Sequence, residues 1–243
     1  MIDSLTFIVF LFIGHSQMYG ECSGTNLGST NPHVWFYSHT SHQIYHGKDA
    51  DKNNIATPFL EEMSLRYPND NFLGVKLDHL GSWERDYLPG NNGFDRVKSA
   101  VDTLKKKKVF FGGVVVMLGY LESSDTLEIE NYIPRMRLIK YGICKETGND
   151  NLPFMIAKFE MNGGINHPMT MPQNYKYKNR LENRIEALEI VDSYFKLFPV
   201  RYVPSDDYCD DHHYNVDGSR ICAEDVAAIF QQNNFDFWNK EKP

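Results

Sequence analysis

The residues best suited to chemistry are a serine near the start of the chain and an aspartate–histidine pair near its end. Ser16 stands in the run Gly-His-Ser-Gln-Met at residues 14–18, directly after an apolar segment. A tight turn there would expose its hydroxyl and leave the following amides free as oxyanion donors. Asp210 and His213 are three residues apart in a polar loop, so the carboxylate can bind one imidazole nitrogen and leave the other for the serine proton. Together these residues predict a Ser–His–Asp triad with Ser16 as the nucleophile.

Two further polar stretches follow apolar runs, and each has a structural as well as a chemical interpretation. In Asp-His-Leu-Gly-Ser-Trp at residues 78–83, Gly81 lets a backbone N–H approach a substrate closely, or it simply turns the chain. After the apolar run that ends at Leu118, Gly119 and Tyr120 lead into Glu-Ser-Ser-Asp at residues 122–125. This cluster could orient a substrate, or cap the helix that follows.

The loop at residues 210–218 has two other interpretations. Asp210, Asp211, His212 and His213 are of the residue types that hold divalent metals. A plain polar surface loop is also compatible with the composition. The serine mechanism needs neither a metal nor an organic cofactor. Metal binding is therefore a hypothesis separate from the triad.

Apolar strands alternate with amphipathic helices along the chain, which predicts βαβ units, a parallel sheet and helices on both faces. Residues 20–56 are interpreted as a long polar loop, which with residues 161–180 would form the walls of the site. Thr57 is a plausible N-cap for the first helix. The pattern favours strands at 6–13, 72–77, 109–118 and 153–159, a short apolar segment at 199–203, and helices at 58–67, 94–104, about 129–136, 179–198 and 219–231.

The predicted fold class is α/β, with three layers in the order α/β/α and a parallel sheet of about five strands. One domain would span residues 1–243. In such sheets function lies at the carboxyl ends of the strands, and that is where the polar motifs fall.

The composition excludes some partners and leaves the compartment open. A net charge of −7 and a pI near 5.7 are unsuited to nucleic acid or an anionic membrane, and the basic run at residues 105–108 is most simply a helix C-terminus. The apolar run at residues 5–13 is too short for a membrane span and lacks the basic residues of a signal peptide. We expect a cytoplasmic protein or the mature form of an exported one. In the second case Cys209 and Cys222 could form a disulfide, and otherwise they are thiols.

The order of these motifs resembles the SGNH (GDSL-like) hydrolase superfamily, in particular its carbohydrate O-acetylesterase branch, which includes sialate O-acetylesterases. That branch opens with a strand and Gly-Gln-Ser-Asn-Met, similar to residues 14–18. Its second block ends in a Gly-Gly-Ser-like turn followed by Trp, similar to residues 80–83. Its last block is Asp-x-x-His with a glycine five residues later, which selects Asp210, His213 and Gly218. The resemblance covers roughly residues 5–230.

The resemblance implies a flavodoxin-like sheet and a carboxylic-ester hydrolase that removes acetyl groups from a carbohydrate or another small ester. In it Ser16 attacks the ester, His213 acts as base and then as acid, and Asp210 orients His213. The backbone amides of Ser16 and Gly81 would hold the oxyanion. The residues implied on the oxyanion and substrate side are Gly81, Gln17, Gly119, Tyr120 and Glu122.

The chain departs from this branch in two places. The branch carries Gln-Gly-Glu-Ser after its third strand. An ungapped match puts residues 118–120 there, and a shifted match pairs Glu122 and Ser123 with its Glu-Ser. Either way the polar oxyanion donor is missing or replaced, and the loss of one such donor costs about 10²–10³ in rate. Gln17 replaces Asn, a milder change because the backbone amide does the main work. The alternative function is a carbohydrate-binding relative that has lost efficient catalysis.

Overall fold

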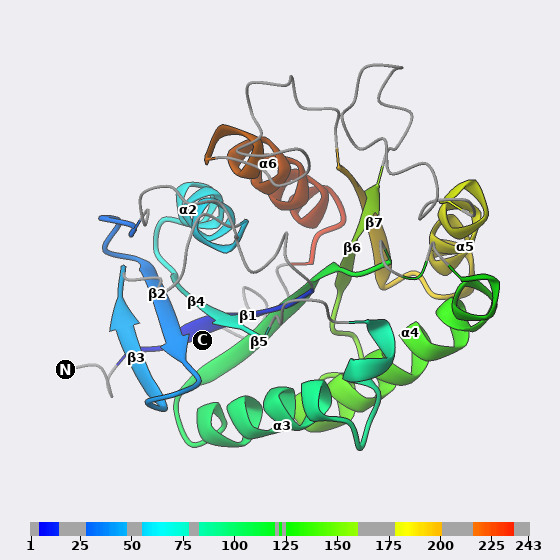
Figure 1. Cartoon of the computed structure of the whole chain (residues 1–243). Helices are drawn as coiled ribbons and strands as arrows, with labels where there is room; N and C mark the ends of the chain where they lie inside the picture. Colours follow the sequence, from blue (N-terminus) through cyan, green and yellow to red (C-terminus); the bar gives the residue numbers. More distant parts are fainter. Residues whose placement is uncertain are drawn as a thin grey trace.

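The computed structural model describes residues 5–14, 28–47, 55–77, 83–119, 122, 125–159, 178–200 and 216–235. Within them, one sheet of seven strands lies between two layers of helices (Figure 1). In chain order the elements are β1 (Phe7–Gly14), β2 (Val34–Ser38), β3 (Gln43–His46), α2 (Ala56–Arg66), β4 (Asn71–Lys76), the short 3₁₀ helix η2 (Glu84–Tyr87), α3 (Asn92–Leu104), β5 (Val109–Met117), α4 (Thr126–Thr147), β6 (Phe154–Phe159), α5 (Lys178–Val191), β7 (Phe195–Val200) and α6 (Val216–Gln232).

The strand order places three strand ends side by side at the centre of the sheet. The order is β3-β2-β4-β1-β5-β6-β7, and every neighbouring pair is parallel except β2 with β3. The strands β4-β1-β5-β6-β7 have the 2-1-3-4-5 order of flavodoxin-like sheets, as predicted. Because β4 lies on one side of β1 and β5 on the other, the carboxyl ends of these three strands are neighbours.

The central strand β1 is buried on both of its faces. Its odd-numbered residues 7–13 pack in one apolar cluster with α3, α4 and α5, and its even-numbered residues 8–12 pack in the other with α2 and α6. Figure 1 shows α2 and α6 on one side of the sheet and α3 and α4 on the other. A strand covered on both faces is apolar throughout, which is why residues 6–13 predict a core strand.

Three predictions of detail are wrong. The stretch 20–56, predicted as a loop, contains β2 and β3, so the sheet has seven strands rather than about five. The helix predicted over 179–198 ends at Val191, and the following apolar residues form β7. Phe195 and Phe198 have helical spacing, but they pack in opposite clusters, as side chains three apart on a strand do. Thr57 is not the N-cap, because Ile55 takes that position and Thr57 is buried inside α2.

The other predicted strands and helices are confirmed. Most bounds differ by a few residues, but α4 continues to Thr147, well beyond the predicted end near residue 136. The predicted end of α3 is correct. This helix ends at Leu104 with Lys105 as its C-cap, so the basic run at 105–108 follows a helix C-terminus as predicted. No helix in the described parts of the chain combines the length and the apolar character that crossing a bilayer requires.

Gly142 lets the buried side of α4 approach α3. A Cβ at this position would lie 2.6 Å from Cε2 of Phe94 and 2.9 Å from Cγ of Pro89. Replacing a glycine inside a helix by alanine ordinarily stabilises the helix by about 0.5–1 kcal/mol. Here the methyl group must displace two packed rings, and overpacking costs about 1–3 kcal/mol. We expect G142A to lower the free energy of unfolding measured in urea.

The control for this substitution is R137A, on the exposed side of the same helix. It should change the free energy of unfolding by less than about 0.5 kcal/mol. A G142A protein at least as stable as wild type would show that α3 and α4 can separate at little cost.

Candidate active site

The described strands end next to three of the four predicted motifs. β1 ends at Gly14, two residues before Ser16. Leu77 directly follows β4, and Gly119 lies two residues after the end of β5. Since these strands are neighbours, the chain leaves the same edge of the sheet at all three motifs. Gly119 and Glu122 are described. The other site residues lie outside the described residues: Ser16, Gln17, Gly81, Tyr120, Asp210 and His213, together with Asp211 and His212 of the alternative metal site.

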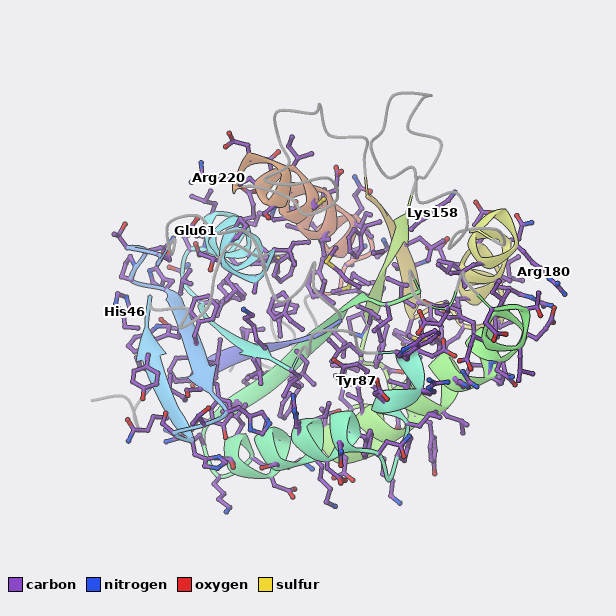
Figure 2. All side chains as sticks on the ribbon, in the orientation of Figure 1. His46, Glu61, Tyr87, Lys158, Arg180 and Arg220 are labelled. Atoms are coloured by element: carbon purple, nitrogen blue, oxygen red, sulfur yellow. The ribbon has the colours of Figure 1, made fainter. Side chains whose placement is uncertain are left out.

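The hydroxyl of Tyr87 joins the end of β1 to the end of β4. Tyr87, labelled in Figure 2, is the last residue of η2 and is 1% exposed. Its hydroxyl oxygen lies 3.0 Å from the carbonyl oxygen of Gly14 and 2.9 Å from that of Leu77, so one proton is shared between two acceptors. It also accepts the N–H of Gly14 at 3.3 Å. One buried side chain thus fixes the backbone that leads to Ser16 relative to the backbone that leads to Gly81.

Gly119 turns the chain out of β5 with a φ of +127°, a conformation that favours glycine. A Cβ there would meet Ile185 and Leu181 of α5 and the hydroxyl of Tyr132 from α4, at 3.4–3.5 Å. That hydroxyl donates to the carbonyl oxygen of Leu118 at 3.1 Å. The start of the third motif is therefore a buried turn between two helices.

The carboxyl group of Glu122 binds backbone from two loops. Its side chain is 0% exposed, and its Oε1 accepts the backbone N–H of Glu84 at 2.6 Å. Hydrogen bonds from the backbone of Gly119 and of Glu122 itself also favour the charged form. At the other end of the cluster, Asp125 accepts the N–H of Leu127 at 2.7 Å and caps α4. The capping interpretation of residues 122–125 is therefore confirmed at Asp125, while the substrate-orienting interpretation stays a prediction. Glu122 has a different role, since it binds backbone.

Glu122 belongs to a buried group of charged side chains that sequence reasoning missed. The Glu84 side chain is 0% exposed, and its Oε1 lies 3.3 Å from a guanidinium nitrogen of Arg135. Arg135 also contacts Glu128, which lies 3.0 Å from Arg85. These residues come from η2, the loop after β5 and α4, so no spacing in the sequence connects them. Nothing in the sequence around position 84 indicates that a charged side chain there is buried.

Burial raises the pKa of both inner carboxyl groups. Desolvation, reinforced by the charge of Glu122, raises the pKa of Glu84 to about 9, although Arg135 opposes the shift. Desolvation raises the pKa of Glu122 to about 7, against the backbone hydrogen bonds. Burial would lower the pKa of Arg135, but Glu128 raises it above its usual value. Glu84 is therefore neutral at pH 7, and the ion-pair partner of Arg135 is Glu128.

The turn between β2 and β3 also lies at the carboxyl edge of the sheet, since Tyr37 pairs with Val75 near the end of β4. Nδ1 of His42 lies 2.8 Å from the Tyr37 hydroxyl oxygen, and Nε2 of His39 lies 3.0 Å from the carbonyl oxygen of Arg96. These rings stand in the stretch 20–56 predicted to wall the site. Within the described residues no group of three or more histidines, cysteines or carboxylates is arranged to hold a metal.

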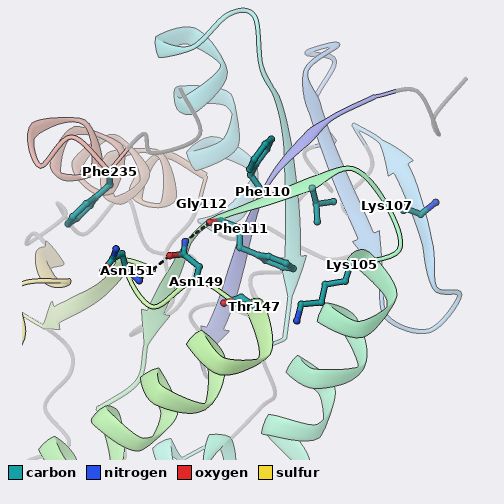
Figure 3. Close-up of a pocket in the computed structure, with 11 residues that line it drawn as sticks. Lys105, Lys107, Phe110, Phe111, Gly112, Thr147, Asn149, Asn151 and Phe235 are labelled. Atoms are coloured by element: carbon teal, nitrogen blue, oxygen red, sulfur yellow. Dashed lines mark hydrogen bonds between the residues drawn. The ribbon is translucent and has the colours of Figure 1, made fainter. Parts of the chain in front are cut away.

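A cavity of about 400 Å³ lies at the opposite edge of the sheet (Figure 3). It surrounds the start of β5, where Phe110 and Phe111 project, and is bordered by Lys105 after α3 and by Asn149 after α4. The amino end of β5 faces away from the strand ends that precede the motifs. This cavity is therefore not part of the candidate active site.

Removing the Tyr87 hydroxyl should destabilise the protein. Y87F keeps the ring but removes the hydroxyl group to which the backbone of Gly14 and Leu77 is bonded. Because those buried groups are left without this partner, we expect the free energy of unfolding measured in urea to fall by about 1–3 kcal/mol. Y45F removes an exposed hydroxyl bonded to Ser41 at 2.8 Å and should cost less than about 0.5 kcal/mol. Equal losses in the two variants would contradict the joining role of Tyr87.

Thermal stability should fall as the pH rises, because the pKa values of Glu84 and Glu122 are higher in the native state than the ordinary value of 4.5. Between about pH 5 and pH 9 the unfolded chain has released these protons while native Glu84 keeps its own, so the native state binds more protons and loses stability with pH. The neutral variant E84Q should show a shallower decline in Tm than wild type over this range.

The control for this pH series is E62Q on α2, where Glu62 forms a surface ion pair with Arg66 at 3.5 Å. It should keep the wild-type slope of Tm against pH. An E84Q slope as steep as that of wild type would mean that native Glu84 is already ionised near neutral pH.

Comparison with solved structures identifies the fold. A protein from Arabidopsis thaliana has a TM-score of 0.74 and 13% identity, covering 93% of this chain and 98% of its own. A carbohydrate acetylesterase from Xanthomonas citri has a TM-score of 0.64 and 14% identity, covering 90% of this chain and 54% of its own. An acetylxylan esterase from Geobacillus stearothermophilus has a TM-score of 0.54 and 14% identity, covering 95% of each chain.

Sequence comparison adds no relative, since neither a protein-family model nor a curated protein sequence matches the chain. The structural likeness extends over nearly the whole described sheet and its helices, and the matched structures include a GDSL-like lipase as well as the esterases. The chain therefore shares the α/β/α fold of these esterases and of the GDSL-like lipase.

Proposed function

We propose that this chain is a serine ester hydrolase that removes O-acetyl groups from a carbohydrate. The observation that carries the proposal is the meeting of β1, β4 and β5 at one edge of the sheet, because three of the four polar motifs follow directly on these strands. In parallel α/β sheets the ligand site is the crevice outside such strand ends, beside the strand where the order reverses. Here that strand is β1, which leads into Ser16.

In the proposed reaction Ser16 attacks the ester carbonyl while His213 takes the proton of its hydroxyl. Asp210 holds the imidazole in the tautomer that can accept this proton and stabilises the imidazolium. Collapse of the tetrahedral intermediate breaks the bond to the sugar oxygen, which leaves with the proton from His213. Water, deprotonated by His213, then attacks the acetyl-enzyme, and acetate leaves as the Ser16 hydroxyl reforms.

The negative oxygen of each tetrahedral intermediate needs fixed hydrogen-bond donors. In the proposal these are the backbone amides of Ser16 and Gly81, with the loop after Gly119 closing the third side. Support comes from the buried scaffolding of the same loops. Tyr87 holds the backbone that leads to Ser16 and Gly81, and the loop after β5 is fixed by its glycine turn and by Glu122.

The matched structures support the same chemistry by analogy. Two of those named above are esterases that act on acetylated carbohydrates according to their names. The Geobacillus acetylxylan esterase has catalytic variants in which a serine or an aspartate is replaced by alanine, the residue types proposed here at positions 16 and 210. The partly exposed ring of His39 and the exposed ring of His42 at the carboxyl edge suit contact with a sugar.

The test is the hydrolysis of p-nitrophenyl acetate and the release of acetate from an acetylated sugar. We expect S16A to lower kcat by at least about 10³-fold, because the nucleophile is gone. The matched control S99A removes a serine hydroxyl from α3, away from the strand ends, and should keep wild-type rates.

A fluorophosphonate probe reports on Ser16 directly, since it labels only an activated serine. It should label wild type and S99A but not S16A. Undiminished turnover by S16A would contradict the assignment of the nucleophile. Sugar binding without acetate release, together with an unlabelled wild type, would instead support the alternative of a carbohydrate-binding relative.

A further inference from the structure

The strongest observation outside the triad is the position of Glu122 between two loops. The side chain is fully buried, and its carboxyl group accepts the N–H of Glu84 at 2.6 Å and is bonded by the backbone of Gly119. Glu84 comes three residues after Gly81, and Gly119 immediately precedes Tyr120. One carboxyl group therefore binds the backbone on either side of the segments that face the proposed oxyanion.

Glu122 is unfavourable for stability at this place. Desolvation acts on its charged form, and Oε2 of Glu122 and Oε2 of Glu84 are both buried with no hydrogen-bond partner among the described residues. A buried acceptor without a partner destabilises the folded state. An apolar residue would fill this site at lower cost but could not accept backbone N–H groups. The need to accept backbone N–H groups therefore accounts for a carboxyl group at this buried position.

From these contacts we infer that Glu122 is a positioning residue, which fixes the spacing between the loop after β4 and the loop after β5 and so preorganises the oxyanion donors. The inference rests on the proposed esterase function. Glu122 does not touch the ester, since its side chain has no exposed surface. It acts through the backbone of Glu84 and Gly119.

The titratable side chains near the Glu122 carboxyl group do not hold it in place. Glu84 faces it from η2, and Glu128 and Tyr132 lie on α4. The charge of Glu128 disfavours the ionised form of Glu122, and Arg135 of the same helix contacts Glu84 and Glu128. The position of the carboxyl group therefore depends on the backbone N–H groups that it accepts.

The test compares E122Q with D192N. E122Q keeps the size of the side chain and one acceptor oxygen but removes the negative charge, so the backbone N–H groups of Glu84 and Gly119 meet a weaker, neutral acceptor and are held less firmly. Displaced donors weaken oxyanion binding only in the transition state, so we expect kcat for p-nitrophenyl acetate to fall by about 10–100-fold with KM changed by less than about two-fold.

D192N is the control for a variant that loses stability while the loops after β4 and β5 keep their positions. Asp192 binds Lys140 and the N–H of Tyr194 near the amino end of β7, at the edge away from the motifs. D192N should lower Tm and leave kcat unchanged. If E122Q behaves in the same way, the inference is overturned, because the carboxyl group is then merely structural.

A second measurement separates this inference from the proposed function. Hydrogen–deuterium exchange in peptides covering residues 83–87 and 117–122 should become faster in E122Q in both segments together, and in D192N in neither. Coupled loosening with reduced kcat supports the inference. Unchanged exchange in E122Q overturns it even when S16A confirms the esterase. A wild type without hydrolysis overturns the proposed function and with it the catalytic role of Glu122, whatever the exchange shows.

Discussion

The double burial of β1 is the constraint from which the rest of the structure follows. A strand covered by helices on both faces leaves no room for a polar side chain along its length, and residues 7–13 are accordingly apolar and at most 1% exposed. Polar side chains that act on a substrate can therefore occur only beyond the end of the strand. The neighbours of β1 obey the same rule on most of their length, so three strand ends come together with polar residues just beyond them.

Loops that leave a sheet edge carry backbone N–H and C=O groups that no strand pairs, and this protein satisfies them with buried side chains. The Tyr87 hydroxyl forms hydrogen bonds with the backbone of Gly14 and Leu77, and the Tyr132 hydroxyl with the carbonyl oxygen of Leu118. The Glu122 carboxyl group accepts the backbone N–H of Glu84. Each of these groups comes from a different part of the chain than the backbone it binds. The tyrosines do so as neutral groups, whereas the carboxyl groups suffer desolvation, and burial raises the pKa of Glu84 to about 9.

The sequence predicts well those parts of the fold that depend on burial on both sides. Strands β1, β4, β5 and β6 are nearly continuous apolar runs, and α3 has its apolar residues at helical spacing. β3 escapes prediction because its one buried residue, Ile44, stands between exposed ones. β2 escapes because its apolar run, residues 34–37, is short and lies within a long polar stretch. The boundary between α5 and β7 is not predicted because Phe195 and Phe198 have helical spacing but equally fit a strand that is buried on both faces. Only their packing in opposite clusters shows that they belong to a strand.

For the candidate site the limit is different, since sequence motifs identify groups that act on a substrate but not the groups that hold them. Ser16, Asp210 and His213 are predicted from residue type and local spacing alone. Tyr87 binds Gly14, 73 residues away in the chain, and Glu84 contacts Arg135, 51 residues away. No local pattern contains this information.

The position of Glu122 also bears on the third motif, where two matches to the family pattern compete. The shifted match pairs Glu122 with the glutamate of Gln-Gly-Glu-Ser. Glu122 is fully buried and its carboxyl group accepts the backbone N–H of Glu84, so this residue has a structural role of its own in the third motif. Under this match Tyr120 takes the place of the missing Gln. A phenol, like an amide, can donate a hydrogen bond to an oxyanion, so in the proposed mechanism Tyr120 would stand in for the amide donor of the family pattern.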